Sequence, residues 1–141
     1  MDRKTHNRLI QAARKISMSW KPRLAAKAKC KIDKALYQCE LCSVYVYEGK
    51  SPVTYDYYMQ VYGELKVIMD NFHMDHISPV DPVDGTMGKP GVDYNWTLYY
   101  SRLFCPEENF QGICKECHDK KSKTENKERR LNKNSRTKGT K

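Results

Sequence analysis

The chain has 141 residues, a net charge of +9 and six cysteines. This length favours one domain with a small core. The N-terminal residues contain no apolar run that could serve as a signal peptide, and no segment approaches the roughly 20 apolar residues that span a bilayer. These features argue against a membrane protein and a secreted disulfide scaffold, and they predict a soluble, cytoplasmic protein with reduced cysteines.

Charge is unevenly distributed along the chain. Residues 1–34 carry 11 Lys/Arg against 2 Asp/Glu, residues 35–114 carry 4 against 11, and residues 115–141 carry 11 against 4. Basic ends suit a polyphosphate backbone, whereas acidic residues in the central body suit divalent cations. Either basic run alone is explained equally well by a solvated helix face or a disordered tail. Together the two ends favour a nucleic-acid partner.

The hydrophobic pattern predicts two basic helices before the first cysteine pair. Over residues 3–18, Leu9, Ile10, Ala13 and Ile16 recur at helical spacing, while basic side chains cover the other side. Pro22 suits a first helical position and predicts a second helix that ends near Cys30.

The central residues predict short strands and loops. Residues 44–47 favour a strand, residues 48–64 a loop with a possible helical turn, and residues 65–69 and 72–77 a strand or a hairpin that carries Asp75 and His76 at its end. Proline and glycine make residues 78–91 a loop, and residues 93–104 favour a helix. In that helix Trp96, Tyr99 and Tyr100 favour core packing over base stacking. A helix is expected from His118, with fraying and disorder from about Asn126.

The cysteines form two C-x-x-C pairs, Cys39 with Cys42 and Cys114 with Cys117. Each pair can deliver two thiolates to one tetrahedral ion, so the two pairs predict a single structural zinc site. Free core thiols and disulfides are the alternatives. Cys30 and Cys105 have no partner at this spacing and are expected to be buried free thiols.

Several motifs occur in a characteristic order: Asp75-His76-Ile77-Ser78-Pro79, then Asn109, then Cys114-x-x-Cys117-His118 with Lys120-Lys121 after it. This order resembles the HNH endonucleases in their zinc-containing form, and most of all the phage-encoded members. The resemblance covers residues 39–125. It implies a ββα-metal core stapled by the zinc site and a place of action in a bacterial host cytoplasm. Together with the basic N-terminal helices and the basic C-terminal helix or tail, the expected fold class is α+β.

The resemblance also implies roles for the site residues. His76 would be the general base, since imidazole has a pKa that suits proton abstraction near neutral pH. Asp75 and His118 would bind a catalytic Mg²⁺ or Mn²⁺ ion, which neutralises charge on the phosphate. Asn109 would brace the loop that carries His76. His73 is a further candidate ligand, although an exposed strand histidine is the commoner case.

The sequence thus predicts a metal-dependent DNA endonuclease that nicks or cuts double-stranded DNA. The alternatives are a zinc-stapled nucleic-acid-binding module without activity and a small metal-binding interaction protein. The expected parts are a basic helical extension (1–34), a nuclease domain (35–128) and a disordered basic tail (129–141). The residues expected to contact DNA are Arg3, Lys4, Arg8, Arg14, Lys15, Lys120, Lys121 and Lys123.

Overall fold

A computed structural model describes residues 1–139, with side chains up to residue 134. The fold is α+β. Its helices are α1 (Arg3–Ser17), α2 (Lys21–Lys29), α3 (Pro52–Tyr62), α4 (Trp96–Leu103) and α5 (Lys115–Gly139), with 3-10 turns at Glu64–Lys66 and Glu107–Asn109. Its strands are β1 (Lys31–Asp33), β2 (Leu36–Gln38), β3 (Tyr45–Tyr47), β4 (Val67–Met69), β5 (His73–His76) and β6 (Phe110–Ile113).

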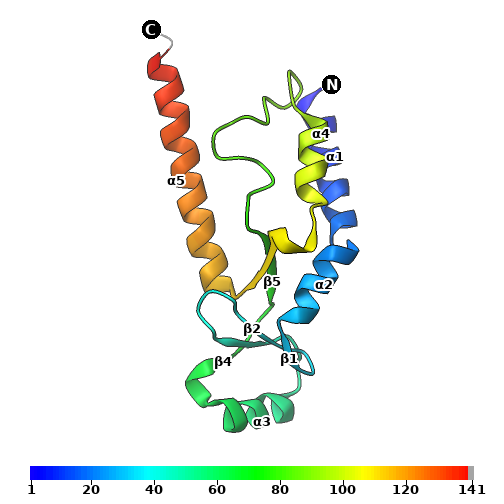
Figure 1. The fold of residues 1–141 in the computed structure, drawn as a ribbon, viewed down its shortest axis with the longest axis vertical. Helices are drawn as coiled ribbons and strands as arrows, with labels where there is room; N and C mark the ends of the chain where they lie inside the picture. Colours follow the sequence, from blue (N-terminus) through cyan, green and yellow to red (C-terminus); the bar gives the residue numbers. More distant parts are fainter. Residues whose placement is uncertain (140–141) are drawn as a thin grey trace.

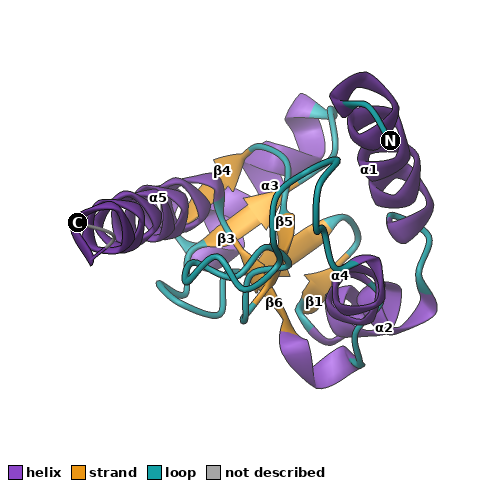
Figure 2. Cartoon of the chain, turned by 90° about the horizontal axis from the view of Figure 1, so that it is seen from above, coloured by secondary structure: helices purple, strands orange, loops and turns teal. Residues whose placement is uncertain are grey.

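The strands form two separate sheets. One has the order β1-β2-β3-β4, and the other is the antiparallel pair β5-β6, in which His76 lies opposite Phe110. The chain passes from β6 directly into α5. Figure 1 shows α3 beneath the four-stranded sheet, and α5 rising on one side of the long loop between β5 and α4. Helix α1 lies on the other side of that loop, and the view from above agrees (Figure 2).

The two predicted N-terminal helices are confirmed, but α1 buries a different face. Its buried residues are His6, Ala13 and Ser17, whereas Leu9 is 38% exposed and Ile16 is 63% exposed. The reason is tertiary, because the His6 ring packs against the rings of Tyr94 and Trp96, with centroid distances of 4.4 Å and 4.8 Å. Local periodicity could not reveal these distant rings.

Residues 48–64, predicted as a loop with a possible helical turn, instead contain a helix of 11 residues, α3. Ser51 caps the helix by accepting from the N–H of Thr54, Pro52 occupies the first turn, and Gly63 ends it with a φ of 98°. The helix is held by Tyr58, which is buried and donates a 2.8 Å hydrogen bond to the Lys34 carbonyl. Tertiary packing therefore stabilises a helix whose sequence has no clear helical period.

Strands form within residues 65–69 and 72–77, as predicted, but their pairing as a hairpin is wrong. β4 pairs in parallel with β3, while β5 pairs with β6, on the far side of residues 77–109. At Asp70 the chain passes from one sheet to the other instead of folding back as a hairpin. The N–H of Asp70 donates a hydrogen bond to the Tyr47 carbonyl at 3.2 Å. The predicted strand at residues 44–47 is confirmed as β3. An unexpected β1–β2 hairpin spans the boundary drawn at residue 34.

Helix α5 continues to Gly139, over the stretch from about Asn126 where the sequence predicts fraying and disorder; residues 140 and 141 lie outside the described chain. Arg129 and Asn132 donate 2.8 Å hydrogen bonds to the carbonyls of Asp81 and Val83 in the long loop. The start of the expected tail thus anchors this loop. The loop and the helix predicted after it, α4, are confirmed.

In the part of the chain that the structure describes, four small buried clusters take the place of a single core. One surrounds the cysteine pairs and comprises Cys30, Cys39, Val46, Phe72, Ile113 and Cys114. Cys30 and Cys105 are buried and free, as predicted, and burial raises the pKa of the Cys30 thiol to about 11. Among the described residues, no helix is long and apolar enough to cross a membrane.

Candidate functional site

The two C-x-x-C pairs meet in one cluster, although 72 positions separate Cys42 from Cys114. All four sulfur atoms lie within 4.8 Å of one another, and those of Cys42 and Cys114 are 3.6 Å apart. Tetrahedral zinc with Zn–S bonds of about 2.3 Å places its sulfurs about 3.8 Å apart. The cluster can therefore hold one metal ion, and its dimensions fit zinc.

Backbone contacts shape both cysteine pairs. Ser43 adopts a left-handed φ of 66° and donates its N–H to the Cys39 carbonyl at 3.0 Å, which closes the first turn. The N–H of Glu40 donates to the Gly112 carbonyl at 2.9 Å, and the Glu40 carboxylate accepts the Gly112 N–H at 2.5 Å. Glu40 thus joins the two pairs directly. A side chain at Gly112 would collide with Phe72.

The protonation chemistry of the cysteines favours a bound cation. Burial raises the pKa of the Cys114 and Cys117 thiols, and for Cys117 the neighbouring sulfurs add to this effect. Burial also acts to raise the pKa of Cys39, but hydrogen bonds from backbone N–H groups, Cys114 first, lower it to about 7. Four thiolates this close repel one another, so their joint ionisation needs a cation.

His76 lies at the end of β5 with its ring in a defined orientation. Its Nε2 is 3.0 Å from the carbonyl oxygen of Leu103, and its ring centroid is 4.7 Å from that of Phe110. A carbonyl can only accept, so Nε2 carries the hydrogen and Nδ1 keeps its lone pair. Burial lowers the pKa of His76, against the opposing effect of the carbonyl. The imidazole is therefore neutral near pH 7 and can accept a proton at Nδ1.

Asn109 holds the chain immediately after His76. Its backbone carbonyl accepts the N–H of Ile77 at 2.8 Å, and its side-chain oxygen accepts the N–H of Ser78 at 3.2 Å. These bonds join the end of β5 to the start of β6 and limit the freedom of the His76 backbone.

Asp75 points to the opposite side of β5, toward α5. Its Oδ2 lies 2.8 Å from Lys121 Nζ, with 19% of each side chain exposed. The same ammonium donates to the His76 carbonyl at 2.9 Å and pairs with Glu125. Burial acts to lower the pKa of Lys121, but its bonds to Asp75 and Glu125 outweigh it and raise that pKa. The Asp75 carboxylate thus occupies a site that attracts a cation.

His118 lies in the first turn of α5, beside Cys117, and its ring packs on that of His73 from β5, with centroids 4.7 Å apart. Its Nδ1 is 3.8 Å from Asp119 Oδ1. The structure therefore brings Asp75 and His118 to the side of β5 that faces α5, and His76 and Asn109 to its end. In the described part of the chain, the four cysteines form the only group of three or more close metal-binding side chains.

Seven of the eight residues expected to contact DNA are exposed: Arg3, Lys4, Arg8, Arg14, Lys15, Lys120 and Lys123. Lys121 is the exception, since its ammonium is engaged by Asp75, Glu125 and the His76 carbonyl. Sequence reasoning missed this structural role and that of Leu103, whose carbonyl orients His76. Neither had a local signal, because a backbone carbonyl at residue 103 could not be matched to residue 76 without the tertiary fold.

We expect Lys121→Met to lower the free energy of unfolding by about 1.5–3 kcal/mol, because the partly buried Asp75 and Glu125 carboxylates would lose their common cation. The matched control is Lys120→Met, next to it on α5. Lys120 is 71% exposed in its side chain and pairs with Glu116 at 3.1 Å, so its loss should leave the free energy of unfolding almost unchanged. Urea unfolding of zinc-loaded protein measures both, and equal losses would contradict the assignment.

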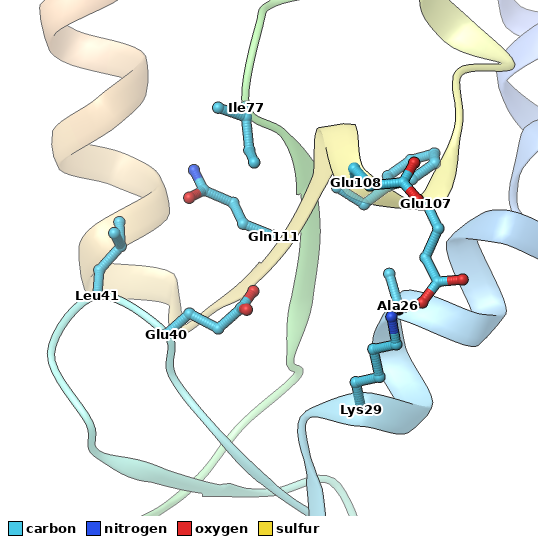
Figure 3. A pocket seen from close by; sticks show the side chains of 9 residues that line it. Ala26, Lys29, Glu40, Leu41, Ile77, Glu107, Glu108 and Gln111 are labelled. Atoms are coloured by element: carbon cyan, nitrogen blue, oxygen red, sulfur yellow. Dashed lines mark ion pairs between the residues drawn. The ribbon is translucent and has the colours of Figure 1, made fainter.

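A cavity of about 350 Å³ lies between α2, β6 and the first cysteine pair (Figure 3). Glu40, Glu107 and Glu108 line it, and Lys29 pairs with Glu107. None of Asp75, His76 and His118 lines this cavity, and its carboxylates would repel a phosphate group. A DNA duplex would instead need an open surface.

Comparison of the chain with protein-family models, curated proteins and solved structures gives no match. The functional argument therefore rests on the chain's own residues and their geometry.

Proposed function

We propose that this protein is a metal-dependent DNA endonuclease of the HNH type, stapled by a zinc ion on Cys39, Cys42, Cys114 and Cys117. The observation that carries the proposal is the orientation of His76, whose Nε2 is bound to the Leu103 carbonyl while Nδ1 keeps a lone pair. The order of the surrounding elements supports the proposal, because β5, β6 and α5 follow the ββα order that the motif resemblance implies. Asp75 and His118 lie on the side of β5 that faces α5.

His76 would accept a proton at Nδ1 from the water that attacks the phosphorus atom. The Leu103 carbonyl stabilises the imidazolium that forms, because it already accepts the hydrogen on Nε2. Asn109 limits motion of the His76 backbone through the bonds to Ile77 and Ser78, so the base stays aligned during attack.

Asp75 and His118 would hold the catalytic cation, Mg²⁺ or Mn²⁺. A carboxylate and an imidazole leave coordination positions open for phosphate oxygens, which suits such an ion. When bound, the cation neutralises charge on the phosphate and on the leaving 3′ oxygen. The cation would share Asp75 with Lys121 or displace its ammonium.

One observation favours a second candidate, a zinc-stapled DNA-binding module without activity. Asp75 is already paired with Lys121 at 2.8 Å, so the carboxylate does not need a metal ion to be neutralised. Both candidates share the exposed basic residues of α1 and α5, and both predict DNA binding.

Supercoiled plasmid incubated with the zinc-loaded protein and Mg²⁺ or Mn²⁺ separates the two candidates. An endonuclease converts it to relaxed or linear DNA, and chelation of the added cation stops the conversion. His76→Ala, purified in the same way, excludes a contaminating nuclease if it leaves the plasmid supercoiled. A wild-type protein that shifts the plasmid on a gel without cutting it would contradict the proposal and favour the binding module.

We expect DNA binding to weaken with salt, and the slope of log K against log [salt] to fall by about two in the double variant Arg8→Gln and Lys15→Gln. Each phosphate contact contributes about 0.9 to this slope, and both side chains are exposed on α1. The matched control is Lys50→Gln with Lys66→Gln, which removes equal charge at the two ends of α3, near the far end of the molecule. Fluorescence anisotropy with a labelled duplex measures the slopes. Equal slopes in the two variants would show that α1 does not contact the backbone.

A further inference from the structure

His73 and His118 come from different elements and meet face to face. His73 lies on β5, two positions before Asp75, and His118 lies on α5. Their ring centroids are 4.7 Å apart, and the ring planes differ by 15°. This is an offset-stacked aromatic pair. Both side chains are partly buried.

The near-parallel planes argue against two histidines sharing one cation. An imidazole binds a metal ion in the plane of its ring, through a nitrogen at about 2.0–2.1 Å. An ion in the plane of His118 would lie outside the plane of His73, out of line with its nitrogen lone pairs. The stack thus lets only one of the two rings bind the cation, and the proposed function assigns that role to His118.

The stacked ring of His73 is in position to hold the plane of His118, whereas Asp119 Oδ1 is 3.8 Å from His118 Nδ1, beyond hydrogen-bond distance. Neighbours that orient a ligating imidazole raise metal affinity, because the ligand need not be ordered when the ion binds.

We propose that His73 is a positioning residue that sets the ring plane of His118 for the catalytic cation, and that it is not itself a ligand. The inference rests on the proposed function, since it assumes that His118 binds that cation. The flat ring of His73 is the part that matters, and its nitrogen atoms are dispensable.

Two substitutions at His73 distinguish the role of its flat ring from the role of its nitrogen atoms. His73→Phe keeps a flat ring and removes both nitrogens, whereas His73→Leu keeps apolar volume and removes the ring. Mn²⁺ binding to the zinc-loaded full chain is measured without DNA, from the electron paramagnetic resonance signal of free Mn²⁺. We expect His73→Phe to bind within about twofold of the wild type, and His73→Leu to bind about three- to tenfold more weakly.

The nuclear magnetic resonance shifts of the His118 ring protons are a readout independent of metal. They should stay displaced by the neighbouring ring in His73→Phe and lose that displacement in His73→Leu. Equal loss of Mn²⁺ binding in both variants would overturn the inference in favour of a ligand role, and unchanged binding in both would overturn it in favour of simple packing. Zinc content and the urea midpoint, measured in each variant, show that it is folded.

Failure of the proposed function is recognised separately. Suppose that the wild type binds Mn²⁺ and that His73→Phe and His73→Leu show the expected difference, but that the wild type leaves the plasmid uncut. This result would support the positioning role of His73 and refute the nuclease activity. A wild type that cuts plasmid while the two His73 variants behave alike refutes the positioning role and keeps the nuclease.

Discussion

His76→Ala is expected to lower the rate constant of DNA cleavage by about a hundredfold or more at every Mg²⁺ or Mn²⁺ concentration, while DNA binding stays nearly intact. The substitution removes the Nδ1 lone pair, and added metal cannot replace a proton acceptor. His76→Asn fills more of the space beside Phe110 and should be equally inactive, because an amide oxygen is a very weak base. Single-turnover cleavage of a saturating duplex measures the effect.

His118→Ala should respond differently to metal. Loss of a ligand weakens the binding of the cation, so part of the lost activity should return as Mg²⁺ or Mn²⁺ is raised. Zinc must be measured in this variant, since His118 follows Cys117 directly. If metal rescues His76→Ala and not His118→Ala, the assigned roles of base and ligand are reversed. If neither substitution slows cleavage, the active site lies elsewhere.

Cys42→Ser is expected to unfold the domain, because zinc binding to such a site contributes about 10–16 kcal/mol and a domain of this size is stable by only about 5–15 kcal/mol. The four buried clusters are small, and the cysteine cluster links residues 39–42 to residues 114–117 within one of them. Circular dichroism and thermal unfolding, together with elemental analysis for one zinc per chain, test this.

Cys105→Ser is the matched control. If packing alone decided stability, the buried Cys105 would be the more sensitive position, whereas we expect the larger loss at Cys42. Cys42 is exposed, so its replacement removes little apolar contact, whereas Cys105 is 4% exposed and lies in a core cluster without metal-binding partners. Cys105→Ser should therefore remain folded, with a loss of about 1–3 kcal/mol from burying a hydroxyl. A folded Cys42→Ser protein, or wild-type protein purified without zinc, would contradict the structural role of the metal.

Several parts of the site were predictable because their signals are local. The C-x-x-C spacing fixes two sulfurs within a single turn, so Cys39 with Cys42 and Cys114 with Cys117 could be recognised as pairs. The start of α2 follows from Pro22, and α4 follows from its run of aromatic and aliphatic residues. The short extended segments around β3 and β5 could also be located, since each depends on the few residues within it.

The partner of each strand depended on the tertiary structure. The sequence placed Asp75 and His76 at the end of a hairpin with residues 65–69, whereas β5 in fact pairs with β6 across residues 77–109. Strand pairing is decided by which arrangement buries most apolar surface, and a run of four residues carries too little pattern to choose among distant partners. The extent of helix α3 was missed for a similar reason, because Tyr58 stabilises this helix through contacts with other elements.

The sequence by itself determined the residue types of the proposed site, namely four thiols, an Asp-His pair, an asparagine and a histidine after the last cysteine. Only the tertiary structure decided how these groups are protonated and paired. The hydrogen on Nε2 of His76 depends on the Leu103 carbonyl, and the charge around Asp75 depends on Lys121. Such contacts join residues 27 to 46 positions apart, and their energies depend on distance and burial, which no local pattern encodes.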